Sequence, residues 1–333
     1  MSDADIDLLI VGAGPAGCAA AAQFRRLGGR PVLLDRTGCA GGLIANAFRV
    51  ENYPGGERPL RGQELAQRLG HHLERFALKV RKGVVTSIRP VERKVPSPLR
   101  EPGPFEDEAP VQPATSRAGF KVTGDFGEML ARAVILACGT VPVQPGIPGE
   151  TQPGLRVFYE VNELLPYLPR TAAVVGGGEA ALDYALSLAE AGAKVLLLVR
   201  SSKLRANCRL VEMVEKEPRI TVSLDTPVRE IQKAPGNRVD LLLPSRRLSV
   251  DGALLAVGRR TLAGSLVPPP PPPLPGAPTA SPLRFQAESP SCLTSIPGLF
   301  IAGDARLGGL GQVGIAVGDG LWCAAAAMAF LNG

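Results

Sequence analysis

The sequence is poor in histidine and in paired cysteines. Only two of its 333 residues are histidines, the adjacent His71 and His72. The six cysteines are Cys18, Cys39, Cys138, Cys208, Cys292 and Cys323. No two of them form a Cys-x-x-Cys pair, and zinc-type spacing is missing. We therefore expect no metal site and interpret the cysteines as buried or incidental thiols, although cysteines distant in sequence can meet in space.

Long apolar runs are also missing. No stretch reaches ~18 uninterrupted apolar residues, the length that spans a membrane. Residues 1–5 are acidic, and the apolar run at residues 6–11 is strand-sized, too short for the core of a signal peptide. The alanine-rich run at residues 321–331 is typical of a buried helix. These features predict a cytoplasmic protein without a membrane span.

Basic blocks interleaved with aromatic residues are missing as well, which disfavours nucleic-acid binding. The net charge is +6, and 45% of the residues are hydrophobic. The simplest interpretation of the charge is a solvated surface, and the alternative is an acidic protein partner steered by a positive field. The length suffices for two domains.

What the chain does have is a glycine turn in each half. The first, Gly12-Ala-Gly14-Pro-Ala-Gly17, and the second, Gly176-Gly-Gly178-Glu-Ala-Ala181, each follow a short apolar run and open an alanine-rich helical run. This is the context of a dinucleotide site, in which glycine lets the backbone approach a pyrophosphate at a helix N-terminus. Two such turns predict two nucleotides in two domains, with electron transfer between them.

The element pattern repeats around the two turns. In the first unit we expect strands at 6–11, 30–35, 80–95 and 117–137 and helices at 18–27 and 62–76. In the second we expect strands at 172–175 and 194–200, helices at 179–191 and 203–216, and further strands to residue 256. A strand into Gly303-Asp304 and a closing helix near residue 314 complete the first unit.

These patterns predict an α/β protein with two Rossmann-like, three-layer domains, the second inserted into the first. The outer domain covers residues 1–142 and 259–333, and the inner one covers 150–258. Proline-rich loops are expected near 96–116 and 267–282. The six prolines at 268–273 favour polyproline II, as a spacer or surface loop or, alternatively, as a ligand for a proline-reading domain.

Motifs along nearly the whole chain resemble the low-molecular-weight thioredoxin reductase family of pyridine nucleotide-disulphide oxidoreductases. They are the two glycine turns, Ala40-Gly-Gly-Leu43, Val50-Glu-Asn-Tyr-Pro-Gly55, Leu136-Ala-Cys-Gly-Thr140, Val257-Gly-Arg259 and Gly303-Asp304. The resemblance implies FAD in the outer domain, NAD(P)H in the inner domain and a homodimer.

The residue chemistry agrees with an FAD site. Asp35 ends the second strand, 23 residues after Gly12, where a carboxylate accepts hydrogen bonds from a ribose diol. The resemblance places Asp304 at the ribityl or pyrophosphate region and Gln312 and Val313 at the flavin edge. The FAD-binding residues that it implies are Gly12, Gly14, Pro15, Ala16, Gly17, Asp35, Arg36, Gly42, Leu43, Asn46, Asn52, Val84, Cys138, Gly139, Gly303, Asp304, Gln312 and Val313.

The inner domain favours NADPH over NADH. Its second strand ends in Arg200 rather than an acid, and arginine suits a 2′-phosphate. The resemblance supports Arg200 and Arg205, but the family's second tandem arginine is Ser201 here. The expected NAD(P)-binding residues are Gly176, Gly178, Glu179, Ala180, Arg200 and Arg205.

The chain departs from thioredoxin reductases at the redox disulfide. In that family a Cys-x-x-Cys pair lies shortly before the second glycine turn, where residues 153–165 here contain no cysteine. Disulfide reduction needs one thiol to attack and one to resolve, so we predict no such activity. The family's glutamine after Gly-Gly is Leu43, and its threonine run is Ala45-Asn-Ala47. These changes leave the flavin ring in a more apolar setting, with FAD still expected.

A branch without the pair, the thioredoxin-reductase-like ferredoxin–NADP+ reductases, is similar at residues 157–161 and 181–186. This implies hydride transfer between nicotinamide C4 and flavin N5, with single electrons passed to ferredoxin or flavodoxin. No acid–base side chain is required, so we expect no catalytic residue. Bacilliredoxin reductases also lack the pair but match Glu51-Asn-Tyr-Pro-Gly55 less well.

Two other functions fit the sequence. A sensor or binding flavoprotein with a vestigial nicotinamide site is suggested by Ser201 and by the altered flavin contacts. An enzyme acting on a small organic substrate at the flavin is disfavoured by the chain length, because no third domain supplies a pocket.

Overall fold

The computed structural model describes residues 6–54, 58–95, 115–267, 292–306 and 311–333. Most of both proline-rich segments expected near 96–116 and 267–282 lies outside the described residues. The chain divides into two compact units. Unit 1 comprises Met1–Ala40, Leu69–Gly139 and Thr261–Gly333, and unit 2 comprises Gly41–Arg68 and Thr140–Arg260.

Unit 1 is built on a mainly parallel sheet. Its parallel strands run in the order β3 (Val80–Lys82), β2 (Pro31–Asp35), β1 (Ile6–Val11), β6 (Gly127–Leu136) and β17 (Leu299–Ile301). The first half of β6 also pairs antiparallel with β5 (Thr115–Gly124), which pairs in turn with β4 (Val85–Val95).

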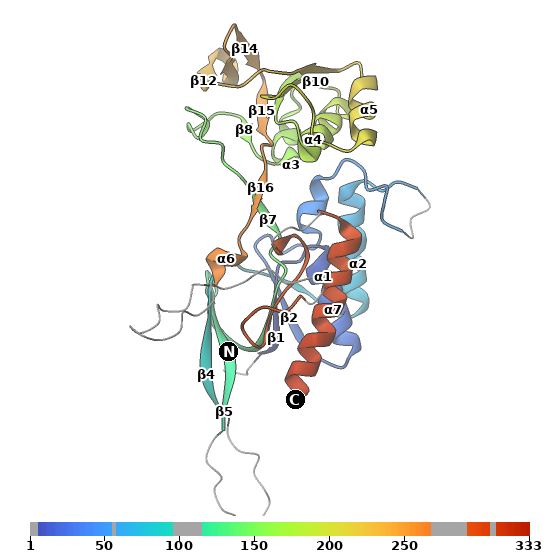
Figure 1. Cartoon of the computed structure of the whole chain (residues 1–333), viewed down its shortest axis with the longest axis vertical. Coiled ribbons are helices and arrows are strands. Elements are labelled where there is room, and N and C mark those ends of the chain that lie inside the picture. The colour runs from blue at the N-terminus through green and yellow to red at the C-terminus, as the bar shows by residue number, and fades with distance from the viewer. Residues whose placement is uncertain (1–5, 55–57, 96–114, 268–291, 307–310) are drawn as a thin grey trace, which may run out of the picture. The chain divides into compact units, whose positions relative to one another are not determined.

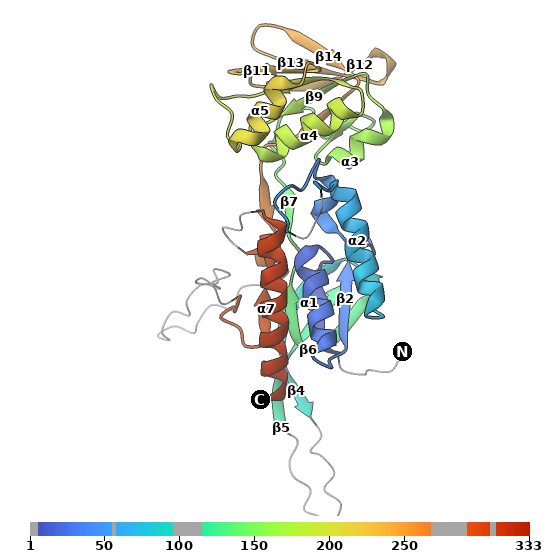
Figure 2. The ribbon, with the colours of Figure 1, turned by 90° about the vertical axis from the view of Figure 1, so that its right-hand side faces the viewer.

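Alternate residues of β1 belong to two cores, as the period-two geometry of a strand requires. Leu8 and Ile10 pack in one cluster with residues of helices α1 (Pro15–Arg26) and α7 (Val313–Asn332). Leu9 and Val11 pack in a second cluster with β4, β5 and α6 (Ala263–Leu266). Helices α1 and α7 lie side by side (Figures 1 and 2).

Unit 2 repeats this plan. Its parallel strands are β11 (Ile220–Ser223), β10 (Lys194–Leu198), β9 (Thr171–Val175), β15 (Gly252–Leu255) and β8 (Val157–Phe158). Its helices α3 (Val161–Leu164), α4 (Glu179–Glu190) and α5 (Cys208–Lys216) are labelled in Figure 1. An antiparallel sheet is formed by β12 (Glu230–Ala234), β13 (Arg238–Leu242) and β14 (Arg247–Val250).

The central strand of unit 2 also faces two cores. Ala172 and Val174 of β9 pack with the helices, whereas Ala173 and Val175 pack with the antiparallel sheet. A two-stranded ribbon of β7 (Thr140–Pro142) and β16 (Arg259–Thr261) and the short helix η1 (Gly42–Asn46) complete the unit. The predicted fold, two three-layer Rossmann-like units with one inserted in the sequence of the other, is therefore confirmed.

Several expected elements differ in their limits. The helix expected at 18–27 is α1, Pro15–Arg26, and the strand expected at 194–200 is β10, Lys194–Leu198. The strand expected at 80–95 is two strands, β3 and β4, and the one expected at 117–137 is the hairpin β5–β6. The helix expected at 203–216 begins at Cys208, because the Arg205 N–H binds the Gly177 carbonyl and Asn207 caps the helix by accepting from the Leu210 N–H. Contacts group Gly41–Arg68 with unit 2, whereas the sequence interpretation assigned these residues to the outer domain.

Helix α7 is longer and less buried than the sequence suggested. It has 20 residues, and by length and composition alone it is apolar enough to cross a membrane, with 28% of its most apolar window buried. The buried residues Ala316, Gly320, Cys323, Ala324 and Ala327 pack α7 into unit 1. We therefore describe α7 as a packed helix of unit 1 that also exposes apolar side chains.

The packing of α7 on α1 predicts opposite effects of alanine at two glycines of α7. A Cβ on Gly320 would lie 2.1 Å from the Ala16 carbonyl oxygen, whereas one on Gly318 meets nothing within 4 Å. Gly320→Ala should destabilise the protein by about 1–3 kcal/mol through overpacking. Gly318→Ala, the matched control, should leave stability unchanged or raise it by up to about 1 kcal/mol, because alanine is the better helix former. Thermal melts followed by circular dichroism measure both, and equal melting temperatures would contradict this packing.

Candidate nucleotide-binding sites

The first glycine turn joins β1 to α1 by a very close backbone approach. Gly12 has φ +106°, and a Cβ there would lie 2.2 Å from the Ala137 carbonyl oxygen. A Cβ on Gly17 would lie 1.8 Å from the Gly12 oxygen. Only glycine fits these two positions, and the turn holds the N-terminus of α1 at the end of the sheet.

The N-terminus of α1 is open. Its N-cap is Gly14, which makes no side-chain capping bond, and Pro15 is the first helical residue. A Cβ added to Gly14 would have no heavy atom within 4 Å. The first N–H groups of a helix need acceptors, and the helix dipole favours an anion there. A pyrophosphate fits both requirements.

Asp35 lies beside this turn. Its Oδ2 accepts a hydrogen bond from the Ala13 N–H at 3.0 Å, and its Oδ1 accepts from the N–H and hydroxyl of Thr37 at 2.8 and 2.6 Å. A carboxylate has about four lone-pair positions, so acceptor capacity remains for a ribose hydroxyl. The next residue, Arg36, is exposed.

Other predicted FAD residues follow neighbouring strands at the same edge of the sheet. Cys138 and Gly139 follow β6, and Gly303 and Asp304 follow β17. Because carboxyl ends of parallel strands share one edge, these residues lie on the side of the first glycine turn. Burial raises the pKa of the Cys138 thiol to about 11, so this cysteine is protonated at neutral pH.

The Gly303 turn is held by an ion pair. The Gly303 N–H donates to Asp319 Oδ2 at 3.0 Å, and Arg306 donates to Asp319 Oδ1 at 2.6 Å. Gln312 is the N-cap of α7, and Val313 is its first residue. Val84 is 46% exposed in unit 1, and its N–H donates to Asp125.

The remaining predicted FAD residues, Gly42, Leu43, Asn46 and Asn52, belong to unit 2. Their place beside a flavin stays a prediction. Asn46 is engaged within unit 2, where its amide donates to Glu160 at 3.1 Å.

The second glycine turn repeats the geometry of the first. Gly176 has φ +149°, and a Cβ there would lie 2.2 Å from the Ala256 carbonyl oxygen. Gly178 is the N-cap of α4, without a side-chain capping bond and with free space around it. The N-terminus of α4 is therefore a second open anion site, with Glu179 and Ala180 in its first turn.

The two sites differ at the residue that meets the ribose. The Gly12 N–H donates to the Leu34 carbonyl at 2.7 Å, and the Gly176 N–H donates to the Leu198 carbonyl at 3.0 Å. The residue after Leu34 is Asp35, whereas the residue after Leu198 is the buried Val199. The second site thus lacks a carboxylate where the first has one.

Basic side chains follow Val199 in the second site instead. Arg200 is exposed directly after Val199, and Arg205 is exposed while its N–H donates to the Gly177 carbonyl at 2.6 Å. Ser201 donates its hydroxyl to the Lys203 carbonyl at 3.1 Å. The backbone bond of Arg205 fixes this basic loop against the second glycine turn.

Sequence reasoning missed a polar network in unit 2. Arg259 donates to Glu160 at 2.8 Å and to the hydroxyl and carbonyl oxygens of Thr140 at 2.9 and 3.0 Å. Glu160 also accepts from Tyr184 at 2.5 Å and from Asn46 at 3.1 Å. The ion pair is shielded, with side-chain exposures of 20% and 13%. Glu160, Tyr184 and Arg259 lie in three separate stretches that carry the family resemblance, but no single motif joins them, because they lie far apart in the chain.

Tyr184 keeps its phenol proton in this network. Burial and the Glu160 charge raise the pKa of Tyr184 well above its usual range. Tyr184 is therefore a permanent donor to Glu160 rather than an acid. Asn46 ties η1 to this ion pair, so the arrangement anchors residues 41–48 to unit 2.

A second anchor of the same segment is Asp183. Its carboxylate accepts from the Phe48 N–H at 2.8 Å, and Phe48 packs on the helical core of unit 2. Burial, reinforced by the charge of Glu179 and opposed by the Phe48 hydrogen bond, raises the pKa of Asp183 to about 6.

Two open helix N-termini, each beside a glycine turn at the carboxyl edge of a parallel sheet, define a protein that binds two dinucleotides. The donors and the free space at Gly14 and Gly178 fit two pyrophosphates, and Asp35 fits an FAD ribose.

Comparisons with known proteins agree with a dinucleotide-binding protein. The model of the pyridine nucleotide-disulphide oxidoreductase family matches residues 6–320. Thioredoxin reductase of Treponema pallidum is 28% identical over 337 residues, covering 99% of this chain and 98% of that protein. Two crystal structures of thioredoxin reductases, from Lactococcus lactis (FR conformation) and from T. acidophilum, are each 26% identical to this chain with a TM-score of 0.76. Both comparisons cover 98% of this chain, together with 99% of the L. lactis chain and 98% of the T. acidophilum chain.

The chain belongs to the pyridine nucleotide-disulphide oxidoreductase family and is thioredoxin reductase-like within it. This family implies an oxidoreductase that uses FAD and NAD(P)H.

The raised pKa of Asp183 predicts a pH-dependent stability. The folded state holds this proton more tightly than the unfolded chain, so the stabilisation is complete below about pH 4 and is lost as the pH rises through about 6. Asp183→Asn keeps an acceptor for Phe48 without the charge. Its melting temperature should exceed that of the wild type at pH 8, by a difference equivalent to about 3 kcal/mol, and this gap should close toward pH 4.

The control is Glu215→Gln, at an exposed position of the same unit. Its melting curve should follow that of the wild type at every pH. A gap between Asp183→Asn and wild type that stays constant from pH 4 to 8 would show that Asp183 is not buried as a charge.

Proposed function

We propose that this protein is an FAD-dependent NADPH oxidoreductase without a redox-active disulfide before its second glycine turn, which passes electrons to a one-electron protein acceptor such as ferredoxin or flavodoxin. The observation that carries the proposal lies before the second glycine turn. Residues 153–165 contain no cysteine, and Glu160 in this stretch is hydrogen-bonded to Arg259, Tyr184 and Asn46. A thioredoxin reductase needs two thiols there.

Bound FAD would supply hydride acceptance from NADPH and electron release to the acceptor. The chain's own residues bind and orient the nucleotides. The first glycine turn and Asp35 would hold the FAD pyrophosphate and ribose, with Gly303 and Asp304 at the same sheet edge. No side chain has to move a proton, which agrees with the scarcity of histidine.

The preference for NADPH rests on Val199 and Arg200. A carboxylate at the position of Val199 would accept from the ribose 2′-hydroxyl of NADH and repel a 2′-phosphate. The buried valine removes that carboxylate, and the exposed guanidinium of Arg200 supplies the charge that suits the phosphate.

The net charge of +6 supports an acidic electron-transfer partner through electrostatic steering. A homodimer is supported by the exposed apolar side chains of α7, namely Ile315, Leu321, Trp322 and Phe330. Within this proposal the protein acts in the cytoplasm and binds neither nucleic acid nor a membrane.

The second candidate function is a sensor flavoprotein with a vestigial nicotinamide site. It is favoured by Ser201, because this residue carries no positive charge for a 2′-phosphate and its hydroxyl donates to the Lys203 carbonyl. The two functions differ in whether the protein catalyses the oxidation of NADPH.

The acceptor experiment uses the FAD-loaded protein with NADPH. Ferricyanide, ferredoxin and flavodoxin are compared with thioredoxin and with the disulfide 5,5′-dithiobis(2-nitrobenzoate). The proposal predicts NADPH-dependent reduction of ferricyanide and of at least one electron-transfer protein, and no catalytic reduction of either disulfide. Efficient thioredoxin reduction would overturn it. Failure of both NADPH and NADH to reduce ferricyanide would leave the sensor function.

Arg200→Ala in the same assay tests the nucleotide site. The KM for NADPH should rise about 10- to 100-fold, the value of one charge-assisted hydrogen bond. The matched control is Arg219→Ala, because Arg219 is also exposed but precedes β11 at the opposite edge of the same sheet. Equal KM values for the two variants would contradict the role of Arg200.

A further inference from the structure

Two cysteines far apart in the sequence meet in unit 1 at one residue of β17. The Ile301 N–H donates to the Cys292 carbonyl at 3.0 Å, and the Cys323 thiol of α7 donates to the Ile301 carbonyl at 3.5 Å. Both cysteines are at most 1% exposed and free. Both side chains belong to the same buried core cluster, with Phe300 and Ala302. The N–H and C=O of Ile301 therefore bring the Cys292 backbone and the Cys323 thiol to one strand edge.

The conformation of Cys292 is unusual. Its φ is +38°, a left-handed value that strains a non-glycine residue. The neighbouring bridge between Leu293 and Phe300 and the hydrogen bond to Ile301 hold it there. The backbone is thus fixed in the conformation that presents Cys292 to Cys323.

The surroundings distinguish the two thiols. The hydrogen bond from Cys323, with a smaller contribution from the Arg306 charge, lowers the pKa of Cys292 against the effect of burial and of Asp319. The same hydrogen bond and burial raise the pKa of Cys323 far above its usual range. Cys292 is therefore the nucleophile of the pair, and Cys323 holds the proton.

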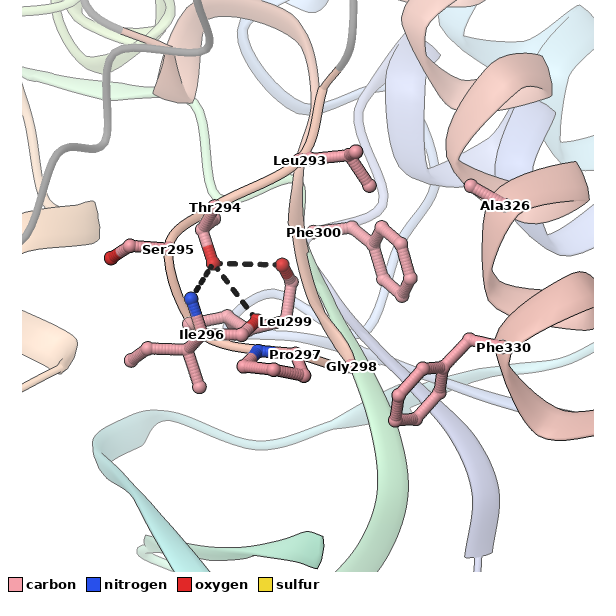
Figure 3. Close-up of a pocket in the computed structure, with 10 residues that line it drawn as sticks. All are labelled: Leu293, Thr294, Ser295, Ile296, Pro297, Gly298, Leu299, Phe300, Ala326 and Phe330. Atoms are coloured by element: carbon pink, nitrogen blue, oxygen red, sulfur yellow. Dashed lines mark hydrogen bonds between the residues drawn. The ribbon is translucent and has the colours of Figure 1, made fainter. Parts of the chain in front are cut away.

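A pocket is lined by residues that neighbour the pair in the chain. It has a volume of about 230 Å³ and is lined by Leu293, which follows Cys292, and by Ala326, about one helical turn beyond Cys323. Figure 3 shows the Phe300 ring pointing toward α7, which carries Ala326 and Phe330. A water molecule occupies about 30 Å³ of liquid, so a molecule the size of hydrogen peroxide fits in this pocket, which is lined by near neighbours of the two cysteines.

We propose that Cys292 and Cys323 are a peroxide-sensitive dithiol that forms an internal disulfide. The Cys292 thiolate attacks one peroxide oxygen, the O–O bond breaks, and the leaving hydroxide takes a proton to become water. Cys323 sulfur then attacks the Cys292 sulfenic acid, the S–O bond breaks, and hydroxide leaves as water with the Cys323 proton. Two electrons pass from the two sulfurs to the peroxide, and two waters form.

The disulfide would act on the Gly303 turn. Asp319, four residues before Cys323, holds both the Gly303 N–H and Arg306, and both residues of this ion pair contribute to the electrostatics of the two thiols. A bond between Cys292 and α7 therefore lies next to a predicted FAD contact. This inference is independent of the proposed acceptor and of NADPH.

The test uses the full-length, thiol-reduced protein, treated with hydrogen peroxide without NADPH, digested without reductant and analysed by mass spectrometry. The expected product is a cross-linked peptide pair joining Cys292 to Cys323, with two thiols lost per chain and regained with dithiothreitol. Single variants Cys292→Ser and Cys323→Ser should lose this product. The matched control replaces the exposed Cys39 and Cys208 with serine and should keep it.

The wild-type digest decides the question even where a serine variant fails to fold. Peptides containing Cys292 and Cys323 that stay reduced, while Cys39 or Cys208 is oxidised, would overturn the proposal. So would a Cys292 cross-link to any other cysteine in the natively folded protein.

Discussion

The close approach of a glycine to a neighbouring strand is the constraint on which both nucleotide sites depend. In unit 1 a Cβ on Gly12 would collide with the Ala137 carbonyl, and in unit 2 one on Gly176 would collide with the Ala256 carbonyl. Because the chain turns so tightly, the helix that follows begins at the sheet edge without a side-chain cap. Each unit thus has an anion site with the same backbone geometry, although the side chains around the two sites differ.

The two sites differ in the residue that follows the carbonyl accepting from the first glycine of the turn. This carbonyl belongs to Leu34 in unit 1 and to Leu198 in unit 2. Asp35 binds the first turn through the Ala13 N–H and keeps acceptor capacity for a ribose. Val199, at the corresponding position of unit 2, is buried and apolar, and Arg200 follows it. The first site therefore fits the ribose of FAD, and we propose that the second takes a phosphorylated ribose. The stretch before the second glycine turn contains no cysteine and holds Glu160, which is paired with Arg259.

The sequence predicted the repeated features well, because they depend on local patterns. Strand periodicity, the glycine turns and the helices at 62–76 and 179–191 follow from residue types alone, and the structure confirms them within a residue. The breaks between strands at residues 83–84 and 125–126 were missed, because the sequence interpretation carried single strands across Gly83 and across Gly124-Asp-Phe-Gly127. The start of α5 depends on the pairing of Arg205 with Gly177, which is a tertiary contact.

The long-range polar contacts were beyond sequence reasoning for the same reason. Glu160, Arg259, Tyr184 and Asn46 are separated by up to 213 positions and belong to no common motif. The same holds for Cys292 and Cys323, which only the pairing around β17 brings together. Sequence reasoning left open that distant cysteines could meet, and the structure shows which two do.

The most direct test of two cooperating nucleotide sites is an anaerobic titration of the FAD-loaded protein with NADPH, followed by flavin absorbance. The account predicts that the absorbance near 450 nm is lost at about one NADPH per flavin, because hydride transfer delivers both electrons to the bound flavin. It also predicts that NADH requires a higher concentration. A flavin spectrum that neither nucleotide changes would contradict the account.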